Sequence, residues 1–413
     1  MKTKFVCALL SLAMVLSLAA CGGGSAGTSD GSSEAENTEN AEGAETGETG
    51  GTEAEPAGGG HGTFKLGSIG PKTGDAAIYG TAVVNGARLA VEEISGTDSA
   101  VKFEYQEQDD EADGEKSVNA YNALMDWGMQ VLVGPTTTGA SIAVAAKAAE
   151  ERTIMLTPSA SSTDVTAAGD NIFQVCFTDP NQGIASALYM AENMPEAKIA
   201  VIYRNDDAYS QGIRDAFAGQ AAESGLDVVY EGTFTKDTAT DFTVQLTAAQ
   251  SAGAELVFLP IYYEPSAVIF NQARAMGYAP TFFGVDGMDG ILTLEGFDTS
   301  LAEGVMLLTP FSADVDDERT QNFVAAYEAE FGVTPNQFAA DAYDGVYIMR
   351  DALIAAGCTD DMSNEEICEA VVAVMPTLSY DGLTGEGLTW DASGAVSKDP
   401  MAFVIQDGVY ARP

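Results

Sequence analysis

Hydroxyl side chains cluster after two successive predicted strands in the first half of this 413-residue chain. They are Thr136, Thr137 and Thr138, directly before a predicted helix, and Ser159, Ser161 and Ser162 after the next strand. The N-terminus of a helix leaves backbone N–H groups unpaired and carries partial positive charge, so a hydroxyl-lined N-terminus can hold a carboxylate. The alternative that these hydroxyls are ordinary helix N-caps stays open.

An acidic side chain follows a predicted strand in the second half of the chain. This residue is Asp286, in the run Val285-Asp286-Gly287. Ligands of open α/β sheets bind beyond the carboxyl ends of the strands. A carboxylate that faced the hydroxyl loops could pair with a ligand ammonium and complete a site for a zwitterion. The alternative is an aspartate that stabilises a turn or caps a helix.

The common catalytic and metal-binding patterns do not point to an enzyme. His61 is the only histidine and lies in a Gly-rich segment. The chain contains no H-E-x-x-H and no G-x-x-x-x-G-K-[ST] motif. Gly67, Gly70 and Gly74 follow the first predicted strand, but they lack the lysine and the spacing of a phosphate-binding loop. We therefore predict a protein without a catalytic residue, a metal or a cofactor.

Two series of alternating apolar runs and helical periods predict the elements that position these residues. The first series has strands at 64–69, 101–106, 130–133 and 153–156 and helices at 83–94, 117–127 and 140–151. The second series has strands at 199–203, 228–231, 256–259 and 281–283 and helices at 211–224, 243–252 and 266–276. A strand at 305–308, helices at 319–331, 338–355 and 365–374, and strand-like runs at 387–390 and 402–405 follow. Such alternation predicts an α/β fold with two Rossmann-like lobes and sheets dominated by parallel strands.

The N-terminal residues indicate export and a lipid anchor. Lys2 and Lys4 precede a short apolar run that ends in Leu-Ala-Ala and is followed by Cys21. A basic start, an apolar stretch too short to span a membrane and small residues before a cleavage site are typical of a signal peptide, here residues 1–20. The run before Cys21 resembles the lipobox of bacterial lipoproteins, in which this cysteine carries the lipid. The alternative is a buried cysteine in an uncleaved segment.

Residues 21–61 are predicted to form a disordered acidic linker behind the lipidated cysteine. The segment is rich in Gly, Ser and Glu and contains no Lys or Arg, so it has little apolar surface to offset the loss of chain entropy. The whole chain carries a formal net charge of −44, which repels nucleic acid and anionic lipid. We therefore expect the protein at the extracellular face of the cell membrane, held by its lipid and not by a basic surface.

Three cysteines lie beyond the leader and Cys21. Cys358 and Cys368 bracket a polar loop, and an exported protein can form disulfides. A bridge between them and two separate thiols both stay open. Cys176 lies in the apolar run Ile-Phe-Gln-Val-Cys-Phe and is predicted to be a small core residue.

Several segments together resemble a known family. They are FKLGSIGPKTGDAAIYGTAVVNGARLAVEEI, QVLVGPTTTGASIAVA, TIMLTPSASS, IAVIYRNDDAYSQG, NQARAMG and GVDG, which follow in this order from about residue 63. The chain is similar in these segments to the extracellular ligand-binding proteins of branched-chain amino-acid ABC transporters, which have the type I periplasmic binding protein fold. The resemblance extends to the C-terminus.

The resemblance implies two lobes that close on a hinge of three crossovers around the ligand. The lobes would comprise residues 62–178 with 309–379 and residues 179–308 with 380–413. The ligand carboxylate would be held by hydroxyls and backbone amides at Thr138, Ser159, Ala160 and Ser161. Asp286 would hold the ammonium group. Aromatic walls would come from Tyr79, Tyr209, Tyr262 and Phe338, which periodicity alone does not distinguish from core residues.

The resemblance also implies partners and leaves the ligand open. A monomer would capture a neutral amino acid, branched-chain or otherwise aliphatic, and deliver it to a membrane permease with its ATPase. The known leucine and isoleucine binders have Glu where this chain has Asp286, and three threonines in the loop at 136–138 depart from the usual small residues. A sensor of the same fold that presents an amino acid or an amide-like solute to a receptor is the alternative function. A hydrolase is disfavoured because the only histidine lies outside the predicted lobes.

Overall fold

The computed structural model describes residues 62–413. The predicted signal peptide, the lipidated Cys21, the acidic linker and His61 lie outside the described residues. The two β-sheets of the described part confirm the predicted α/β class, and their parallel strands occupy the positions that the apolar runs indicate.

The first sheet has five strands, all parallel, in the order β2-β1-β3-β4-β5. They are β1 (Gly62–Gly70), β2 (Val101–Asp109), β3 (Val131–Val133), β4 (Ile154–Thr157) and β5 (Ile172–Gln174). The three residues of β3 and the four of β4 are fully buried, as is typical of parallel strands that are covered on both faces. The hydroxyl loops therefore begin at the carboxyl ends of neighbouring central strands.

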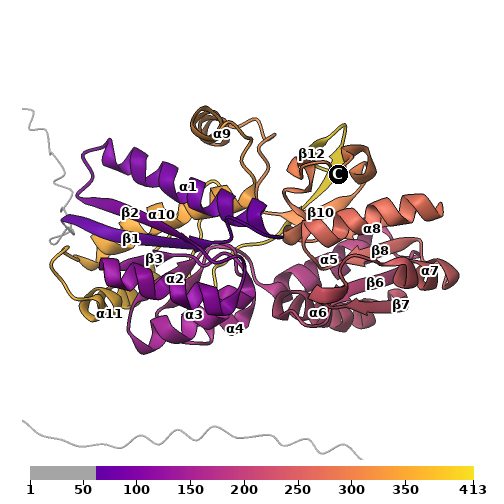
Figure 1. Ribbon diagram of the computed structural model, residues 1–413, viewed down its shortest axis with the longest axis horizontal. Helices are drawn as coiled ribbons and strands as arrows, with labels where there is room; N and C mark the ends of the chain where they lie inside the picture. The colour runs from indigo at the N-terminus through magenta and orange to yellow at the C-terminus, as the bar shows by residue number, and fades with distance from the viewer. Residues whose placement is uncertain (1–61) are drawn as a thin grey trace, which may run out of the picture. The chain divides into compact units, whose positions relative to one another are not determined.

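Helices cover both faces of this sheet (Figure 1). The helices of the first lobe are α1 (Ala77–Ser95), α2 (Gly114–Trp127), α3 (Thr138–Glu150), α4 (Thr163–Thr166), α9 (Glu318–Phe331), α10 (Gln337–Ala356) and α11 (Asn364–Val374). Helices α1 and α10 pack together on one face, while α2 and α3 pack together on the other. Gly86 of α1 lies against the backbone carbonyl of Ala339 in α10, so the absence of a side chain there lets the two helices approach closely.

The second sheet has seven strands in the order β12-β11-β10-β9-β8-β6-β7. They are β6 (Lys198–Arg204), β7 (Asp227–Phe234), β8 (Leu256–Leu259), β9 (Thr281–Gly284), β10 (Met306–Thr309), β11 (Met401–Gln406) and β12 (Val409–Ala411). Strands β6 to β10 pair in parallel, whereas β11 and β12 add an antiparallel edge. The parallel part corresponds to the predicted second series.

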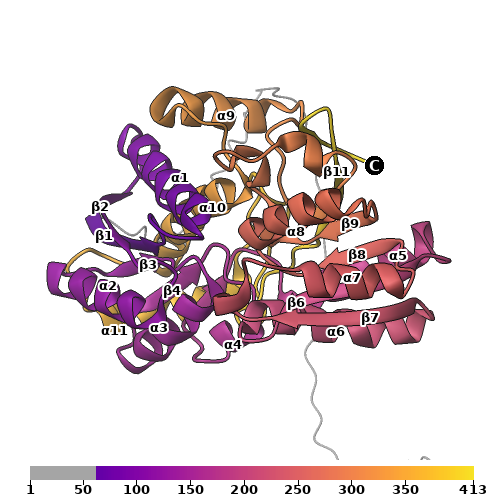
Figure 2. The same ribbon diagram turned by 45° about the vertical axis from the view of Figure 1, so that its right-hand side comes forward.

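Two pairs of helices cover the faces of the second sheet (Figure 2). The helices of this lobe are α5 (Asp179–Asn193), α6 (Ala208–Ser224), α7 (Thr243–Ser251) and α8 (Tyr263–Met276). Helices α5 and α6 pack against each other on one face, and α7 and α8 lie on the other. The second lobe also contains short 3-10 helices, which are η1 (Lys236–Thr238), η2 (Asp286–Met288), η3 (Ile291–Thr293) and η4 (Thr299–Ala302). A fifth, η5 (Met375–Thr377), follows α11 in the first lobe.

Helix α5 is an element that the sequence analysis did not predict. Asp179 and Pro180, at the predicted start of the second lobe, form the first turn of α5. Proline is favourable in this turn because its missing N–H would have no intrahelical partner. Thr178 is the N-cap, and its hydroxyl accepts a hydrogen bond from the backbone N–H of Asn181 at 3.4 Å.

The last crossover occurs later than the predicted lobe boundary at residue 380. Trp390 Nε1 donates to the Gln174 carbonyl at 2.8 Å, and the Gln174 N–H donates to the Gly394 carbonyl at 3.0 Å. These bonds hold the chain on β5 of the first sheet well past residue 380. It joins the second sheet only at β11, which begins at Met401.

The three cysteines within residues 62–413 are separate thiols. Cys176, Cys358 and Cys368 are all free and buried, so the bridge between Cys358 and Cys368, one of the two alternatives, does not form. Both side chains are part of the apolar interior: Cys358 directly follows Gly357, the C-cap of α10, and Cys368 lies on the buried face of α11. Burial raises the pKa of each thiol to about 11.

No helix within residues 62–413 is both long enough and apolar enough to cross a membrane.

Candidate functional site

The threonine loop places two hydroxyls at the N-terminus of α3. Thr137 is the N-cap residue, yet its side chain caps nothing, and its buried Oγ1 has no hydrogen-bond partner among residues 62–413. Thr138 begins the helix and is buried, whereas the Thr136 hydroxyl donates to the Ile69 carbonyl at 3.3 Å. The N-cap alternative therefore fails for Thr137, and the end of α3 keeps the polar groups that suit an anion.

The serine loop is fixed to this threonine loop and to α5. Ser159 Oγ donates to the Thr136 carbonyl at 2.8 Å, and Ser161 Oγ donates to Asp179 Oδ1 at 2.6 Å. Ser162 is an ordinary N-cap, since its side chain accepts from the N–H of Asp164. The Ala160 N–H, which the resemblance assigned to a ligand carboxylate, already donates to Thr157 Oγ1 at 3.0 Å. Thr138 thus begins α3, while the Ala160 N–H is already bonded within its own loop.

Asp286 is held rigidly at the carboxyl end of β9. Its backbone N–H donates to Gln182 Oε1 of α5 at 3.1 Å, and its carbonyl accepts from Gln337 Nε2 of α10 at 2.7 Å. Its Oδ1 accepts a 2.5 Å hydrogen bond from the Tyr209 hydroxyl. The side chain is only 3% exposed, so these hydrogen bonds hold it in a buried position.

Burial dominates the electrostatics of Asp286. It raises the pKa of the carboxyl group to about 7, although the hydrogen bond from the Tyr209 hydroxyl opposes the rise, and the charge of Asp341 adds to it. Ionising a buried carboxyl group without a counter-charge costs free energy, because the charge loses its solvation by water. A cationic partner would lower its pKa and recover the lost solvation.

The four predicted wall residues form one aromatic cluster. Tyr79 of α1 contacts Tyr262 edge-on with ring centroids 5.3 Å apart, and Phe338 of α10 with centroids 4.3 Å apart. Tyr262 in turn contacts Tyr209 of α6 at 5.0 Å. These rings come from helices of both lobes, and they pack around the residues that follow β9. The structure therefore brings Tyr79, Tyr209, Tyr262 and Phe338 together beside Asp286.

Tyr79 also connects the lobes through its hydroxyl. The hydroxyl donates to the Gly287 carbonyl and accepts from the Tyr263 N–H at 3.1 Å. Beside it, a side chain on Gly290 would collide with Ile78 of the first lobe. These contacts join α1 to the segments after β8 and β9.

We expect Tyr79→Phe to weaken ligand binding by loosening lobe closure. Each of the two lost hydrogen bonds contributes about 1 kcal/mol to the closed form. A ligand that contacts both lobes binds the closed form, so its binding free energy must make up for this loss. The affinity should therefore fall roughly five- to thirtyfold. Calorimetric titration measures the change. Tyr105→Phe is the matched control, since the Tyr105 hydroxyl donates to the Val84 carbonyl within the first lobe. Equal losses in both variants would contradict a role in closure.

Asp179 and Gln182 are site residues that the sequence analysis missed. Both lie on α5, the helix that was not predicted, one turn apart. Asp179 is 1% exposed and accepts from Ser161, while Gln182 is fully buried and accepts from the Asp286 N–H. The signal that could have found them is the Asp179–Pro180 pair after Thr178, which is typical of a helix N-terminus.

A family model and proteins of known description match most of the described residues. A family model described as periplasmic binding protein matches residues 63–408. A Brucella melitensis protein described as Leu/Ile/Val-binding protein homolog 3 is 29% identical over 299 residues, which cover 72% of this chain and 80% of that protein. A Pseudomonas aeruginosa protein described as binding leucine, isoleucine, valine, threonine and alanine is 26% identical over 75% of this chain and 82% of its own length.

Solved structures show the same architecture. The branched-chain amino-acid transporter protein LivJ from Streptococcus pneumoniae, in complex with isoleucine, is 28% identical with a TM-score of 0.75 and covers 84% of this chain and 98% of its own. A solute-binding protein from Rhodopseudomonas palustris in complex with benzoate is similar in fold, with a TM-score of 0.75 at 20% identity, covering 85% of this chain and 95% of its own.

Proposed function

The chain belongs to the periplasmic binding protein family, and from this premise we propose that it captures a zwitterionic amino acid between its two lobes for an ABC importer. It is a solute-binding protein of the Leu/Ile/Val type and not an enzyme. A neutral aliphatic side chain would contact the aromatic cluster, the carboxylate would lie at the N-terminus of α3, and the ammonium would lie against Asp286.

The observation that carries this proposal is the buried, hydrogen-bonded carboxylate of Asp286. Within residues 62–413 it forms no ion pair with Lys or Arg. A ligand ammonium would supply the missing cation. An aromatic carboxylate, such as the benzoate bound by the Rhodopseudomonas protein, would instead bring a second anion to a buried negative group. The charge at Asp286 therefore favours amino acids over aromatic acids.

A thermal-shift screen tests the choice of ligand class. Ligands that bind the native state raise the melting temperature in proportion to the logarithm of their concentration over Kd. We expect a shift with at least one of leucine, isoleucine, valine, threonine and alanine, and none with benzoate. A shift with benzoate alone would overturn the amino-acid proposal.

The pH dependence of binding should follow the carboxyl group of Asp286. An ammonium pairs with the ionised carboxylate, and ionisation is incomplete below a pKa of about 7, so affinity should fall as pH drops from about 7 to about 5 and stay level above 7. The loss of affinity approaches about tenfold per pH unit for one coupled proton.

Other titratable groups face the same site from neighbouring elements. Tyr79 and Tyr209 stay neutral because burial raises their pKa, Asp341 is paired with Lys398, and Asp179 acts in the same direction as Asp286.

Titration calorimetry in two buffers with different ionisation enthalpies measures this coupling. Near pH 6 binding should release protons, because the ammonium displaces them from the site. An affinity for L-leucine that is constant between about pH 5 and pH 8 would show that Asp286 does not titrate against the ligand.

Delivery from the membrane surface is part of the same proposal. Lipidation of Cys21, with the acidic segment that follows it as a tether, would let the two-lobed protein reach a permease while the lipid keeps it nearby. Cys21→Ala should release the protein from membranes into the soluble fraction without changing its ligand affinity. Retention of the Cys21→Ala variant on membranes would contradict the anchor.

A further inference from the structure

The carboxylate of Asp179 has one satisfied and one unsatisfied oxygen. Oδ1 accepts the 2.6 Å hydrogen bond from Ser161. Oδ2 is buried and has no hydrogen-bond partner among residues 62–413. The residue as a whole is 1% exposed. Buried carboxylate oxygens are rarely left without a partner, because the lost solvation is expensive.

The unsatisfied oxygen lies against helix α6 of the second lobe. A Cβ at Gly212 of α6 would lie 3.0 Å from Oδ2. Tyr209 stands three residues before Gly212, on the same face of α6, and its hydroxyl donates to Asp286. The Asp179 carboxylate therefore lies between the serine loop and the helix face that carries the Asp286 partner. Gly212 gives it room there.

Charges around Asp179 are consistent with a cation in this position. Burial raises the pKa of its carboxyl group well above the usual value, the Ser161 hydrogen bond opposes this, and the nearby charges of Asp286, Asp207 and Asp164 add to it. Asp286 thus repels Asp179 when both are ionised. One ammonium placed between them would remove this repulsion and satisfy Oδ2.

We infer that Asp179 is a second acceptor for the ligand ammonium, so that the site requires a primary amine more strictly than it requires a carboxylate. This inference rests on the proposed function and narrows its substrate class to solutes with a free amino group. Asp179 comes from α5 and Asp286 from the end of β9, so the amine is held from two elements. Ser161 orients Asp179 through Oδ1 and leaves Oδ2 for the ligand.

Analogues of one ligand test the inference on the unaltered protein. L-Leucine, 3-methylbutylamine and 4-methylpentanoate share a side chain and differ only in the charged groups. We expect 3-methylbutylamine, which lacks the carboxylate, to bind more tightly than 4-methylpentanoate, which lacks the amine. Tighter binding of 4-methylpentanoate would overturn the inference. Failure of the unaltered protein to bind leucine, isoleucine, valine, threonine or alanine would instead overturn the proposed function.

Asp179→Asn tests the residue itself, because it keeps the shape and the acceptor for Ser161 while removing the charge. Loss of one charge-assisted hydrogen bond should lower the affinity for L-leucine roughly ten- to hundredfold. The affinity for 4-methylpentanoate should stay the same or rise, since a repelling charge has gone. A purely structural role would weaken both ligands equally, and this result would refute the inference.

Ser162→Ala is the matched control variant. It removes a hydroxyl of the same loop, the N-cap of α4 that accepts from the Asp164 N–H, and it leaves both carboxylates and Ser161 in place. We expect a smaller loss of L-leucine affinity than in Asp179→Asn and an unchanged preference for leucine over 4-methylpentanoate. Thermal melting of each variant confirms that the comparison is made on folded protein. A change of preference in Ser162→Ala as large as that in Asp179→Asn would assign the effect to the loop and not to Asp179.

Discussion

Asp286→Asn should lower the affinity for the amino-acid ligand by about thirtyfold or more. Truncating one partner of a buried, hydrogen-bonded charge pair costs roughly 2–5 kcal/mol of binding free energy. The isosteric amide keeps an acceptor for the Tyr209 hydroxyl, which now reaches Oδ1 at 2.5 Å, so the cavity shape changes little. Calorimetric titration with L-leucine measures the loss directly.

The same variant should melt no lower than the wild type when no ligand is present. Burial raises the pKa of Asp286 from its ordinary value to about 7. A carboxyl group with a raised pKa in the folded state costs stability as pH rises from its unfolded pKa to its folded one. The neutral amide avoids this cost. Binding and stability should therefore move in opposite directions, as expected for a residue kept for its ligand.

Asp298→Asn is the control for the loss of one negative charge. Asp298 lies in the same lobe, is exposed, and caps a short 3-10 turn through the Ser300 N–H, a function that asparagine performs equally well. Its replacement should leave affinity unchanged. A similar loss of affinity in both variants would mean that the net charge of the lobe, and not the carboxylate of Asp286, attracts the ligand.

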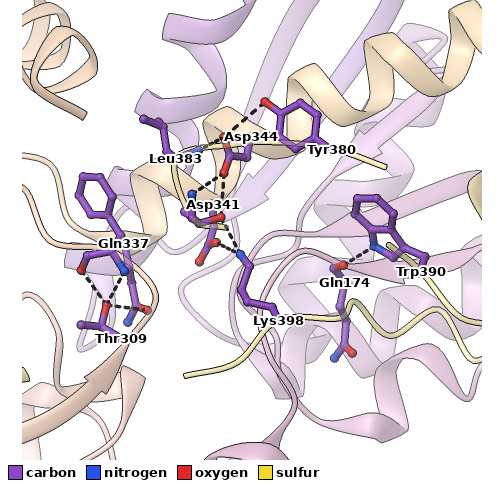
Figure 3. Close-up of polar contacts among 11 residues, drawn as sticks. Gln174, Thr309, Gln337, Asp341, Asp344, Tyr380, Leu383, Trp390 and Lys398 are labelled. Carbon is purple, nitrogen blue, oxygen red and sulfur yellow. Dashed lines mark hydrogen bonds and ion pairs between the residues drawn. The ribbon is translucent and has the colours of Figure 1, made fainter. Parts of the chain in front are cut away.

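Lys398→Met should destabilise the folded protein by about 3–5 kcal/mol, since it leaves buried carboxylates without their cation. Lys398 is 4% exposed; its Nζ donates to Asp341 Oδ1 at 2.8 Å and to Thr384 Oγ1 at 2.6 Å (Figure 3). Asp344, one turn along α10 from Asp341, accepts from the N–H groups of Leu383 and Thr384 at 3.0 and 2.9 Å. Unfolding in urea gives the change in stability.

The loss of folding stability in Lys398→Met should become smaller as pH falls. Burial raises the pKa of both Asp341 and Asp344, and the charge of Lys398 opposes this rise. Without the lysine these groups take up protons more readily in the folded state, so acid relieves the repulsion. Lys116→Met is the control, because Lys116 pairs with Glu111 on the surface, with each side chain 50% exposed, and such a pair contributes at most about 1 kcal/mol. Equal losses of stability in the two variants would show that burial does not make the pairing of Lys398 with Asp341 more important for stability than a surface ion pair.

The sequence predicted the strands of this fold better than its crossovers. Short apolar runs identify buried parallel strands such as β8, whose predicted and observed limits coincide at 256–259. Helix α5 was missed, although Thr178 and Pro180 suit an N-cap and a first turn. The segment from residue 380 to β11 follows the first sheet through hydrogen bonds to Gln174, and such long-range pairing has no local periodicity.

Only the residues of the candidate site that follow predicted strands could be placed from the sequence pattern. The hydroxyl loops and Asp286 stand at strand ends, where local sequence and strand order determine position. The aromatic cluster came only from the family resemblance, since Tyr79 and Tyr209 are spaced like core residues. Asp179 contacts Ser161 across 18 residues, and Lys398 contacts Asp341 across 57. Pairs of this kind depend on how separate elements pack, which the sequence pattern does not specify.

A crystal structure of the protein with a bound amino acid tests the central claim most directly. The ligand ammonium should lie within hydrogen-bond distance of Asp286, and the ligand carboxylate should lie at the N-terminus of α3 near Thr137 and Thr138. The side chain should contact Tyr79, Tyr209 and Tyr262. A ligand with its carboxylate toward Asp286, or bound away from these residues, would contradict the account.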